Sequence, residues 1–332
     1  MEYPLGAEWG ENVFVFGLAR HALLRGLKLA GVRPGDAVML PEFICRELLA
    51  PVHLAGAHPV FYPVDEQLEP VSFPAAANVK AVLAVDYFGF PQDLAPFHEY
   101  CDACHAVLIE DNAHGFLSRD AQGELLGRRG DMGILSLRKT FPLPDGGALV
   151  LNRDGLQDDH SPSPDFRDDP LPLGYRIKAA FRRIQKTTGV PLKTFGETAA
   201  RAVRTFRTGS PFPETGPDCE RVIPGPPGMH RESFRQLCRQ DRTGEEERRK
   251  RLYFEVAECL KGTDISPVFS ELPDGTVPYG FPFRAESHTA SIVAARMRRM
   301  GFDCAFWPEL PEAVAADAPR HYRDVHWVNF LC

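Results

Sequence analysis

The sequence predicts an α/β fold with a mainly parallel sheet, followed by a smaller α+β unit. Through the first half of the chain, short β-rich apolar runs alternate with longer helical segments, a pattern typical of parallel sheets covered by helices on both faces. The chain has 332 residues, a length that suggests about two domains. The Pro- and Gly-rich stretch 209–228 is typical of a domain junction. We therefore expect a large domain over residues 1–228 and a small C-terminal domain over residues 229–332.

The expected elements follow the chain in order. Strands are expected at the apolar, β-rich runs 37–40, 59–62, 81–85, 106–109, 133–137 and 148–151. Helices are expected where apolar residues recur at helical spacing, over 18–30, 45–55, 94–104 and 245–260. Segments 278–283 and 300–307 are expected to belong to the small unit. In such sheets ligands bind at the carboxyl ends of the strands, so the residues directly after each strand are candidate site residues.

The middle of the chain joins an acidic segment to a basic one. Residues 154–169 carry six aspartates among Ser and Pro, which indicates a solvated loop. Residues 176–207 carry nine Lys and Arg against the single acid Glu197, with apolar residues at helical spacing near their start. We expect a solvated helix face with Arg182, Arg183 and Lys186 pointing outward; the alternative is a binding site for a phosphorylated substrate or an acidic partner. The segment 154–207 is interpreted as an insertion in the large domain.

Composition excludes several classes of protein. With 44% apolar and 10% aromatic residues the chain can bury a sizeable core, which excludes a disordered or collagen-like chain and a small disulfide scaffold. The net charge of -7 argues against nucleic acid or an anionic membrane as a partner. No apolar run approaches the ~18 residues of a membrane span, and the N-terminus lacks a secretory pattern, so we expect a cytoplasmic protein.

The eight cysteines predict neither a metal site nor a disulfide framework. They are scattered through a large chain, which favours reduced thiols, and no Cys/His set has zinc spacing. Cys101, Cys104 and His105 match the C-x-x-C-H pattern of covalent haem attachment. Because that pattern is short and here ends a predicted helix, packed and reduced cysteines are the favoured interpretation.

The candidate chemistry lies after the predicted strands. Lys139 comes just past a strand in a turn-rich segment, Asp111 ends the preceding strand, and His114 follows three residues later. Residues 18–20 start a helix, where free backbone N–H groups and the helix dipole favour a phosphate. A lysine for a Schiff base, an aspartate for a pyridinium nitrogen and a phosphate cradle are what pyridoxal phosphate requires of a protein.

Six segments, in order within residues 14–151, resemble blocks of the pyridoxal phosphate-dependent sugar aminotransferases, the DegT/DnrJ/StrS group of fold-type I enzymes. They are GVRPGDAVMLP, LAGAHPVFYPVD, VDYFGFPQDL, VLIEDNAHG, GRRGDMGILSL and PDGGALVL. The second half of the chain is similar more loosely. The resemblance implies a fold-type I transferase fold, pyridoxal phosphate as cofactor and a homodimer.

The same resemblance implies roles for particular residues. Lys139 matches the lysine that forms the Schiff base and then transfers the substrate proton. Asp111 matches the aspartate that pairs with the cofactor's ring nitrogen, and His114 a residue beside its phenolic oxygen. The remaining implied cofactor-binding residues are the start of the phosphate-binding helix and two single positions: Leu18, Ala19, Arg20, Ser136 and Cys45.

The sequence departs from the family pattern at three places. Cys45 stands where the family usually has an aromatic residue stacked on the cofactor ring. The loop from Ser136 to Lys139 is two residues shorter than usual, and Arg176 stands where many members have an asparagine that crosses the dimer interface. For Asp86, Tyr87, Tyr279 and Trp307, core packing and a place in the site both stay open.

The resemblance implies an aminotransferase that moves an amino group from a donor, usually glutamate, to a keto-sugar nucleotide or a related cyclic ketone. The departures motivate a second hypothesis, a dehydration, elimination or condensation in natural-product biosynthesis. A third is a degenerate regulatory or binding homologue whose basic segment holds an acidic partner. The intact Lys139, Asp111 and His114 argue against this third hypothesis.

Overall fold

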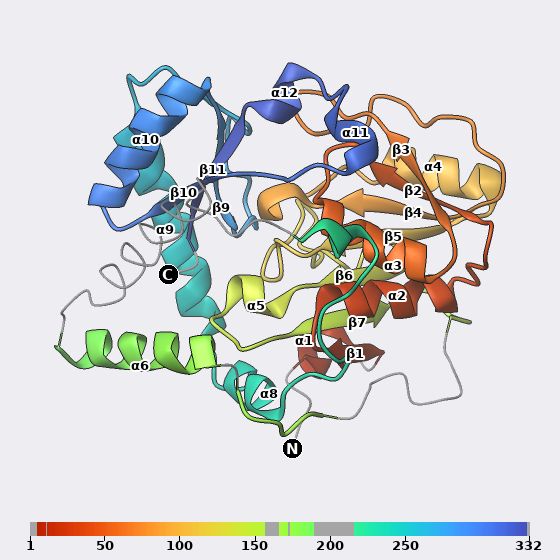
Figure 1. The fold of residues 1–332 in the computed structure, drawn as a ribbon, viewed down its shortest axis with the longest axis horizontal. Coiled ribbons are helices and arrows are strands. Elements are labelled where there is room, and N and C mark those ends of the chain that lie inside the picture. The colour runs from red at the N-terminus through yellow and green to blue at the C-terminus, as the bar shows by residue number, and fades with distance from the viewer. Residues whose placement is uncertain (1–4, 11, 157–165, 172, 189–215, 331–332) are drawn as a thin grey trace. The chain divides into compact units, whose positions relative to one another are not determined.

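The computed structural model describes residues 5–10, 12–156, 166–171, 173–188 and 216–330 (Figure 1). The chain divides into two compact units, one formed by residues 1–167 and 218–332 and the other by residues 168–217. The first unit contains both sheets described below, and the second contains the helix α6 (Leu173–Thr188). The predicted domain limits, with a boundary at residue 228, stay a prediction.

A seven-stranded sheet forms the centre of the N-terminal half (Figure 1). Its strands are β1 (Val13–Phe16), β2 (Ala37–Pro41), β3 (His58–Tyr62), β4 (Val79–Val85), β5 (Val107–Asn112), β6 (Met132–Leu135) and β7 (Gly147–Leu151), in the spatial order β1-β7-β6-β5-β4-β2-β3. The pairs β2/β3, β2/β4, β4/β5 and β5/β6 are parallel, whereas β7 is antiparallel to both of its neighbours. The α/β class with a mainly parallel sheet is therefore confirmed, and β1 is a strand that the sequence analysis missed.

Short connections and helices link these strands. They are α1 (Gly6–Trp9), α2 (Ala19–Leu29), the 3-10 turns η1 (Arg46–Leu48) and η2 (Tyr87–Gly89), α3 (Leu49–Leu54), α4 (Ala95–Cys104) and α5 (Leu137–Thr140). Helix α2 packs against β1, β6 and β7, α3 against β3, and α4 against β4 and β5. These crossover helices return the chain to the amino edge of the sheet, which places every βα connection at the carboxyl edge.

Both faces of the sheet are buried. Along β7, Leu149 and Leu151 belong to the larger core with the α2 residue Leu23, whereas Ala148 and Val150 belong to a second core on the opposite face. Alternate side chains of a strand point to opposite faces, so apolar residues at every position of β7 are buried on one side or the other. This burial explains why the strands appear in the sequence as continuous apolar runs.

A four-stranded antiparallel sheet forms the C-terminal part. It contains β8 (Ser266–Pro267), β9 (Gly280–Arg284), β10 (Asp303–Phe306) and β11 (Val325–Asn329), in the order β10-β11-β9-β8. The helical segments of this part are η3 (Pro217–Glu220), α8 (Arg231–Leu237), α9 (Arg242–Leu260), α10 (Ser287–Arg299), α11 (Glu312–Ala315) and α12 (Arg320–Arg323). Helix α9 begins at Arg242 because the Asp241 side chain accepts a hydrogen bond from the Gly244 N–H. The predicted α+β character of this part is confirmed.

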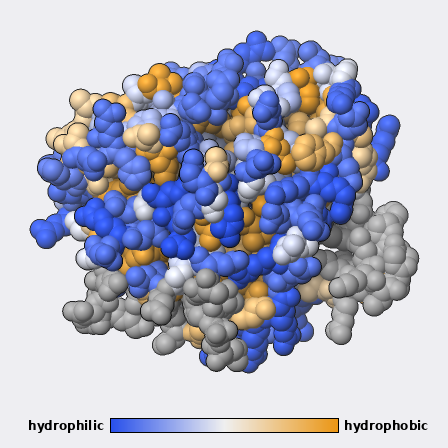
Figure 2. Space-filling model, turned by 180° about the vertical axis from the view of Figure 1, so that it is seen from behind, coloured by the Kyte–Doolittle hydropathy of each residue, from blue (hydrophilic) through white to orange (hydrophobic). Residues whose placement is uncertain are grey.

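Hydrophilic residues cover most of the face drawn in Figure 2, with apolar residues interspersed among them. Within the described ranges, we find neither a helix with the length and apolarity of a membrane span nor a cluster of three potential metal ligands. The side chains of Arg182, Arg183 and Lys186, for which an outward orientation is predicted, are not among those that the structure describes. Most of the acidic segment 154–169 lies outside the described ranges.

Candidate active site

A cavity opens at the carboxyl edge of the seven-stranded sheet and holds about 70 Å³ of water-accessible space. A single water needs roughly 10–15 Å³ of such space, so the cavity has room for a group of several atoms. The lining residues follow β1, β2, β4, β5, β6 and β10: Leu18, Ala19, Arg20, Ile44, Cys45, Glu47, Leu48, Val85, Asp111, Ala113, His114, Ser136, Arg138, Lys139 and Trp307. All eight residues predicted to bind a cofactor therefore lie around one cavity.

Lys139 lies on α5, a single helical turn directly after β6. The turn is anchored by Leu137 and Thr140, both buried, and by the Lys139 N–H, which donates to the Ser136 carbonyl at 3.0 Å. Its Nζ lies 3.0 Å from His114 Nε2. Burial disfavours the ammonium form and lowers the pKa of Lys139, although Cys45 and Asp111 act in the opposite direction. The site therefore favours a neutral amine, the form that is nucleophilic.

The hydrogen bonds of His114 assign its protons. The Phe88 N–H points at His114 Nδ1 at 3.2 Å, so Nδ1 acts as an acceptor and carries no proton. The proton of the neutral ring is then on Nε2, which donates it to the lone pair of Lys139 Nζ. Burial, reinforced by the nearby Lys139, lowers the pKa of His114 well below its ordinary value of 6.5. Both shifts act in the direction that favours the neutral forms, which this hydrogen bond requires.

Aromatic rings fix the plane of His114. Tyr279 stacks on it at 4.5 Å with an interplanar angle of 9°, and Phe88 lies on it at 5.7 Å and 29°. Trp327 in turn stacks on Tyr279 at 4.6 Å. The Phe88 carbonyl also accepts a hydrogen bond from the Tyr279 backbone N–H. Phe88 therefore contacts His114 directly and also positions Tyr279, the ring stacked on it.

The backbone that carries Phe88 is strained. Phe88 has a φ of 56°, which is uncommon for a bulky residue, and Gly89 follows with a φ of 87°. A Cβ at Gly89 would lie 2.8 Å from the Val277 carbonyl oxygen. Only glycine fits there, because the turn brings η2 directly against the C-terminal part of the chain. In this conformation the Phe88 N–H points at His114 Nδ1.

Asp111 presents a buried carboxylate to the cavity from the end of β5. Its Oδ1 accepts a hydrogen bond from the Ala113 N–H at 3.1 Å, and its Oδ2 accepts none from the described residues. Burial raises the pKa of Asp111, while Lys139 and the Ala113 N–H lower it. A carboxylate with a free oxygen in such surroundings is suited to accept a hydrogen bond from a cationic N–H group.

The opposite end of the cavity is suited to an anion. Helix α2 has eleven residues, and its N-cap Leu18 provides no side-chain hydrogen bond, which leaves the N–H groups of Ala19 and Arg20 without an intrahelical or capping partner. The Ser136 hydroxyl lines the same cavity and makes no hydrogen bond to the described residues. The Arg20 guanidinium lies 3.3 Å from Glu47.

Cys45 lies in the cavity wall, where the resemblance places a stacking aromatic residue. Burial raises the pKa of its thiol to about 11, so the group is a neutral, compact side chain. Among the cavity residues within the described ranges, Trp307 is the only phenylalanine, tyrosine or tryptophan. The sequence WPELP left the place of this tryptophan open, and the structure brings it to the site.

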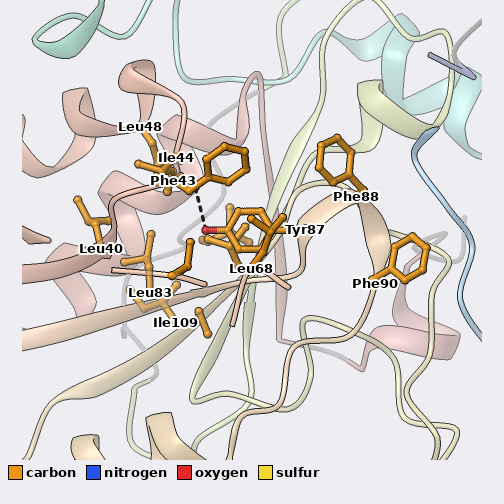
Figure 3. Packing of buried hydrophobic residues seen from close by; sticks show 14 of the residues in the cluster. Leu40, Phe43, Ile44, Leu48, Leu68, Leu83, Tyr87, Phe88, Phe90 and Ile109 are labelled. Atoms are coloured by element: carbon orange, nitrogen blue, oxygen red, sulfur yellow. Dashed lines mark hydrogen bonds between the residues drawn. The ribbon is translucent and has the colours of Figure 1, made fainter. Parts of the chain in front are cut away.

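Asp86 and Tyr87 do not line the cavity. Tyr87 is buried and donates its hydroxyl to the Phe43 carbonyl at 2.8 Å, as Figure 3 shows. Asp86 is fully buried and accepts from Arg129 at 2.8 Å, while Glu110 lies 2.6 Å from the same guanidinium. Burial and the neighbouring Glu110 raise the pKa of Asp86. For both residues the packing alternative is the one observed.

Several residues of the site were not predicted from the sequence, and three of them bear on its chemistry. Glu47 and Arg138 line the cavity beside predicted residues, and their proximity in sequence to Cys45 and Lys139 was the available signal. Phe88 contacts His114 through its backbone N–H. Because every residue except proline has this group, the residue type gives no indication of such a contact.

Solved structures of aminotransferases have a similar fold. Aminotransferase TlmJ from Streptoalloteichus hindustanus aligns with a TM-score of 0.64 and 20% identity over 98% of this chain and 84% of its own. Residues 11–161 match the model of the DegT/DnrJ/EryC1/StrS aminotransferase family. The resemblance read from the sequence is thereby confirmed.

Two curated relatives match the same part of the chain. A GDP-perosamine synthase from Vibrio cholerae is 29% identical over 144 residues, which are 41% of this chain and 39% of the relative. A dTDP-4-dehydro-2,3,6-trideoxy-D-glucose 4-aminotransferase from Saccharopolyspora spinosa is also 29% identical over 144 residues, 41% of this chain and 37% of the relative. The matched region thus spans about two-fifths of the length of these relatives.

Proposed function

We propose that the protein is a pyridoxal phosphate-dependent aminotransferase that transfers an amino group, with glutamate as donor, to a keto-sugar nucleotide or a related cyclic ketone. The observation that carries the proposal is the buried Lys139 amine, which lies 3.0 Å from His114 in a cavity that Asp111 also lines. On the resemblance alone, we also propose that it acts as a homodimer. The cytoplasmic location stays a prediction.

The residues of the cavity fit the proposed cofactor at three points. Lys139 would bind its aldehyde carbon, and the free Oδ2 of Asp111 would accept the ring N–H. The N–H groups of Ala19 and Arg20 and the hydroxyl of Ser136 would hold its phosphate. Apart from Lys139, whose Nζ contacts His114, each of these groups has no hydrogen-bond partner at the relevant atom among the described residues, which supports a ligand of this charge pattern.

Pyridoxal phosphate supplies an electron sink that allows a C–H bond beside a bound nitrogen to ionise. The chain supplies the proton transfer. A neutral Lys139 Nζ can accept a proton and return it, and a lowered pKa brings this base closer to the working pH. The Nε2–H of His114 orients the lone pair of Nζ, and the rings of Tyr279 and Phe88 keep the imidazole in that plane. The Asp111 carboxylate would keep the ring nitrogen of the cofactor protonated.

The substrate class is supported by the relatives. One is named as the synthase of a GDP-linked amino sugar and another as the 4-aminotransferase of a dTDP-linked keto-sugar. These names favour transamination of a nucleotide sugar over the dehydration, elimination or condensation that the departures at Cys45 and the Ser136 loop had motivated.

Incubation with amino donors tests the reaction type. We expect the visible absorbance of the pyridoxal phosphate-loaded protein to disappear on addition of L-glutamate without any acceptor, with one 2-oxoglutarate formed per site. Added 2-oxoglutarate should restore the band, which is the internal control for reversibility. A protein that binds the cofactor but leaves the band unchanged with every proteinogenic amino acid would contradict transamination.

The pH dependence of cofactor uptake tests the state of Lys139. Because burial lowers the pKa of its amine below 10.5, the neutral form prevails at a lower pH than in an ordinary lysine. The rate at which apoprotein takes up pyridoxal phosphate, followed by absorbance, should rise with pH and level off below pH 10.5. Free Nα-acetyl-lysine in the same buffers provides the reference. An inflection at or above that reference would refute the buried, neutral amine.

A further inference from the structure

Trp307 is the aromatic wall of the cavity. Trp307 follows β10 and is half-buried, and its backbone N–H donates to the Val325 carbonyl at 3.2 Å. Its indole lies near four rings, Phe43 at 5.4 Å, Tyr87 at 6.2 Å, Phe88 at 5.1 Å and His114 at 5.1 Å. These contacts connect the C-terminal part of the chain to the carboxyl edge of the large sheet.

The geometry of those contacts leaves the indole without a stacked ring. The interplanar angles to the four neighbours are 80°, 74°, 68° and 64°, all edge contacts. Among the described residues, no aromatic side chain lies parallel to Trp307. An indole that borders a cavity without a parallel partner offers a flat apolar surface to a ligand.

The loop that carries Trp307 is held by Arg46. The Arg46 N–H donates to the Glu309 carbonyl at 2.9 Å, and its guanidinium binds Glu309 at 3.2 Å and Glu312 at 2.5 Å. The same guanidinium also binds Glu220 at 3.0 Å. Arg46 directly follows the cavity residue Cys45. Its bonds to Glu309 and Glu312 therefore connect the segment after Trp307 to the segment that carries Cys45. A site fixed in this way loses less conformational entropy when a ligand binds.

Trp307 borders the end of the cavity where the reaction would occur. Its ring is 5.1 Å from His114, whose Nε2 contacts the Lys139 amine at 3.0 Å. The candidate phosphate-binding groups of α2 and the ring-nitrogen partner Asp111 are contributed by other elements, after β1 and at the end of β5. A molecule approaching the amine would therefore pass beside the indole.

We propose that Trp307 is the specificity-determining residue on which the ring of the amino acceptor stacks, so that the acceptor is a cyclic sugar rather than an open-chain keto acid. This inference rests on the proposed function. A pyranose ring has an apolar C–H face of about the size of an indole, and burying the two together stabilises the complex without fixing the positions of its hydroxyl groups. Cys45, a compact thiol, also lines this cavity and occupies less of it than an aromatic residue would.

Calorimetric titration of the cofactor-loaded protein with two nucleotide sugars, dTDP-glucose and GDP-mannose, tests the proposal. Neither compound has a ketone, so binding is measured without reaction. We expect at least one to bind, Trp307→Leu to weaken that binding about tenfold or more, and Trp307→Phe to weaken it no more than about threefold, since phenylalanine keeps a ring. Trp327→Phe is the matched control, because Trp327 stacks on Tyr279 and does not line the cavity.

The affinity for pyridoxal phosphate, followed by visible absorbance, and the thermal unfolding of each variant are measured alongside. Cofactor affinity should stay close to the wild-type value in both Trp307 variants. The unfolding temperature should fall in Trp307→Leu, because the indole loses its contacts with four rings, and it only has to show that the variant is folded during the titration. Unchanged sugar binding in Trp307→Leu, or binding of neither sugar by the wild type, would overturn the proposal. Loss of cofactor affinity with unchanged sugar binding would also overturn it, by placing the indole on the cofactor. A wild type that binds sugars but no pyridoxal phosphate would instead refute the proposed function.

Discussion

Replacing Lys139 with alanine is expected to abolish transamination and the visible absorbance of bound pyridoxal phosphate, while the protein stays folded. The amine is the group expected to form the Schiff base and to carry the proton, and the loss of a general acid–base group typically costs 10²–10⁴-fold in rate. Loss of the covalent attachment should increase this effect. Absorbance after addition of the cofactor and an assay with glutamate and 2-oxoglutarate measure the two effects.

The fold should tolerate the substitution. Alanine is a good helix former in the α5 turn, and removal of a buried amine leaves no uncompensated charge. We expect the free energy of unfolding to change by no more than about 1 kcal/mol. Lys139→Arg is the matched variant, because arginine restores a long basic side chain that stays protonated and cannot act as a nucleophile. A visible band or measurable turnover in either variant would assign the chemistry to another group.

The eight predicted site residues come together for a reason that sequence patterns contain. Each follows a β-rich run, and parallel strands bring their carboxyl ends to the same edge. Lys139 and Asp111 are therefore neighbours because β5 and β6 are neighbours, although 28 positions separate them in the sequence. The prediction of a shared cavity needed only the strand order and the residue types.

Other parts of the site depend on contacts that no local pattern encodes. Strand β1 is only four residues long, which is short for a periodicity signal, so it was missed. Tyr279 stacks on His114 only because the antiparallel C-terminal sheet docks beside η2. The left-handed backbone of Phe88 is likewise imposed by that docking, since phenylalanine itself does not favour it.

Arg249 is the clearest example of a residue whose importance appears only in the tertiary structure. In the sequence it is one cation in a charged run, yet on α9 it is among the most deeply buried side chains, with 1% exposed. Its guanidinium donates to the carbonyl oxygens of Lys139 and Thr140 at 3.2 and 2.9 Å. It also donates to the carbonyl oxygens of Pro278 and Tyr279, each at 3.3 Å. The Arg249 side chain thus connects the backbone of Lys139 to the backbone of Tyr279, whose ring stacks on His114.

Replacing Arg249 with methionine is expected to lower the free energy of unfolding by about 3–5 kcal/mol, since it breaks a buried ion pair with Glu245 and leaves four carbonyl groups without this donor. The same change should loosen α5 and admit water to Lys139. The burial that lowers the pKa of the amine would then weaken, and the inflection for cofactor uptake should move up toward 10.5. Chemical denaturation and the pH profile of uptake measure the two effects separately.

Arg248→Met is the matched control for this experiment. Arg248 precedes Arg249 on the same helix and also binds Glu245, but its other bond goes to the Phe330 carbonyl and its side chain is 30% exposed. Its loss should cost about 1 kcal/mol or less and leave the uptake profile unchanged, because neither Glu245 nor Phe330 is a residue of α5. If Arg249 only stabilised the fold, Arg249→Met and Arg248→Met would differ in the free energy of unfolding and have the same pH profile of cofactor uptake. An inflection that moves in Arg249→Met alone would establish that the buried guanidinium positions the reactive amine, and equal profiles in both variants would refute it.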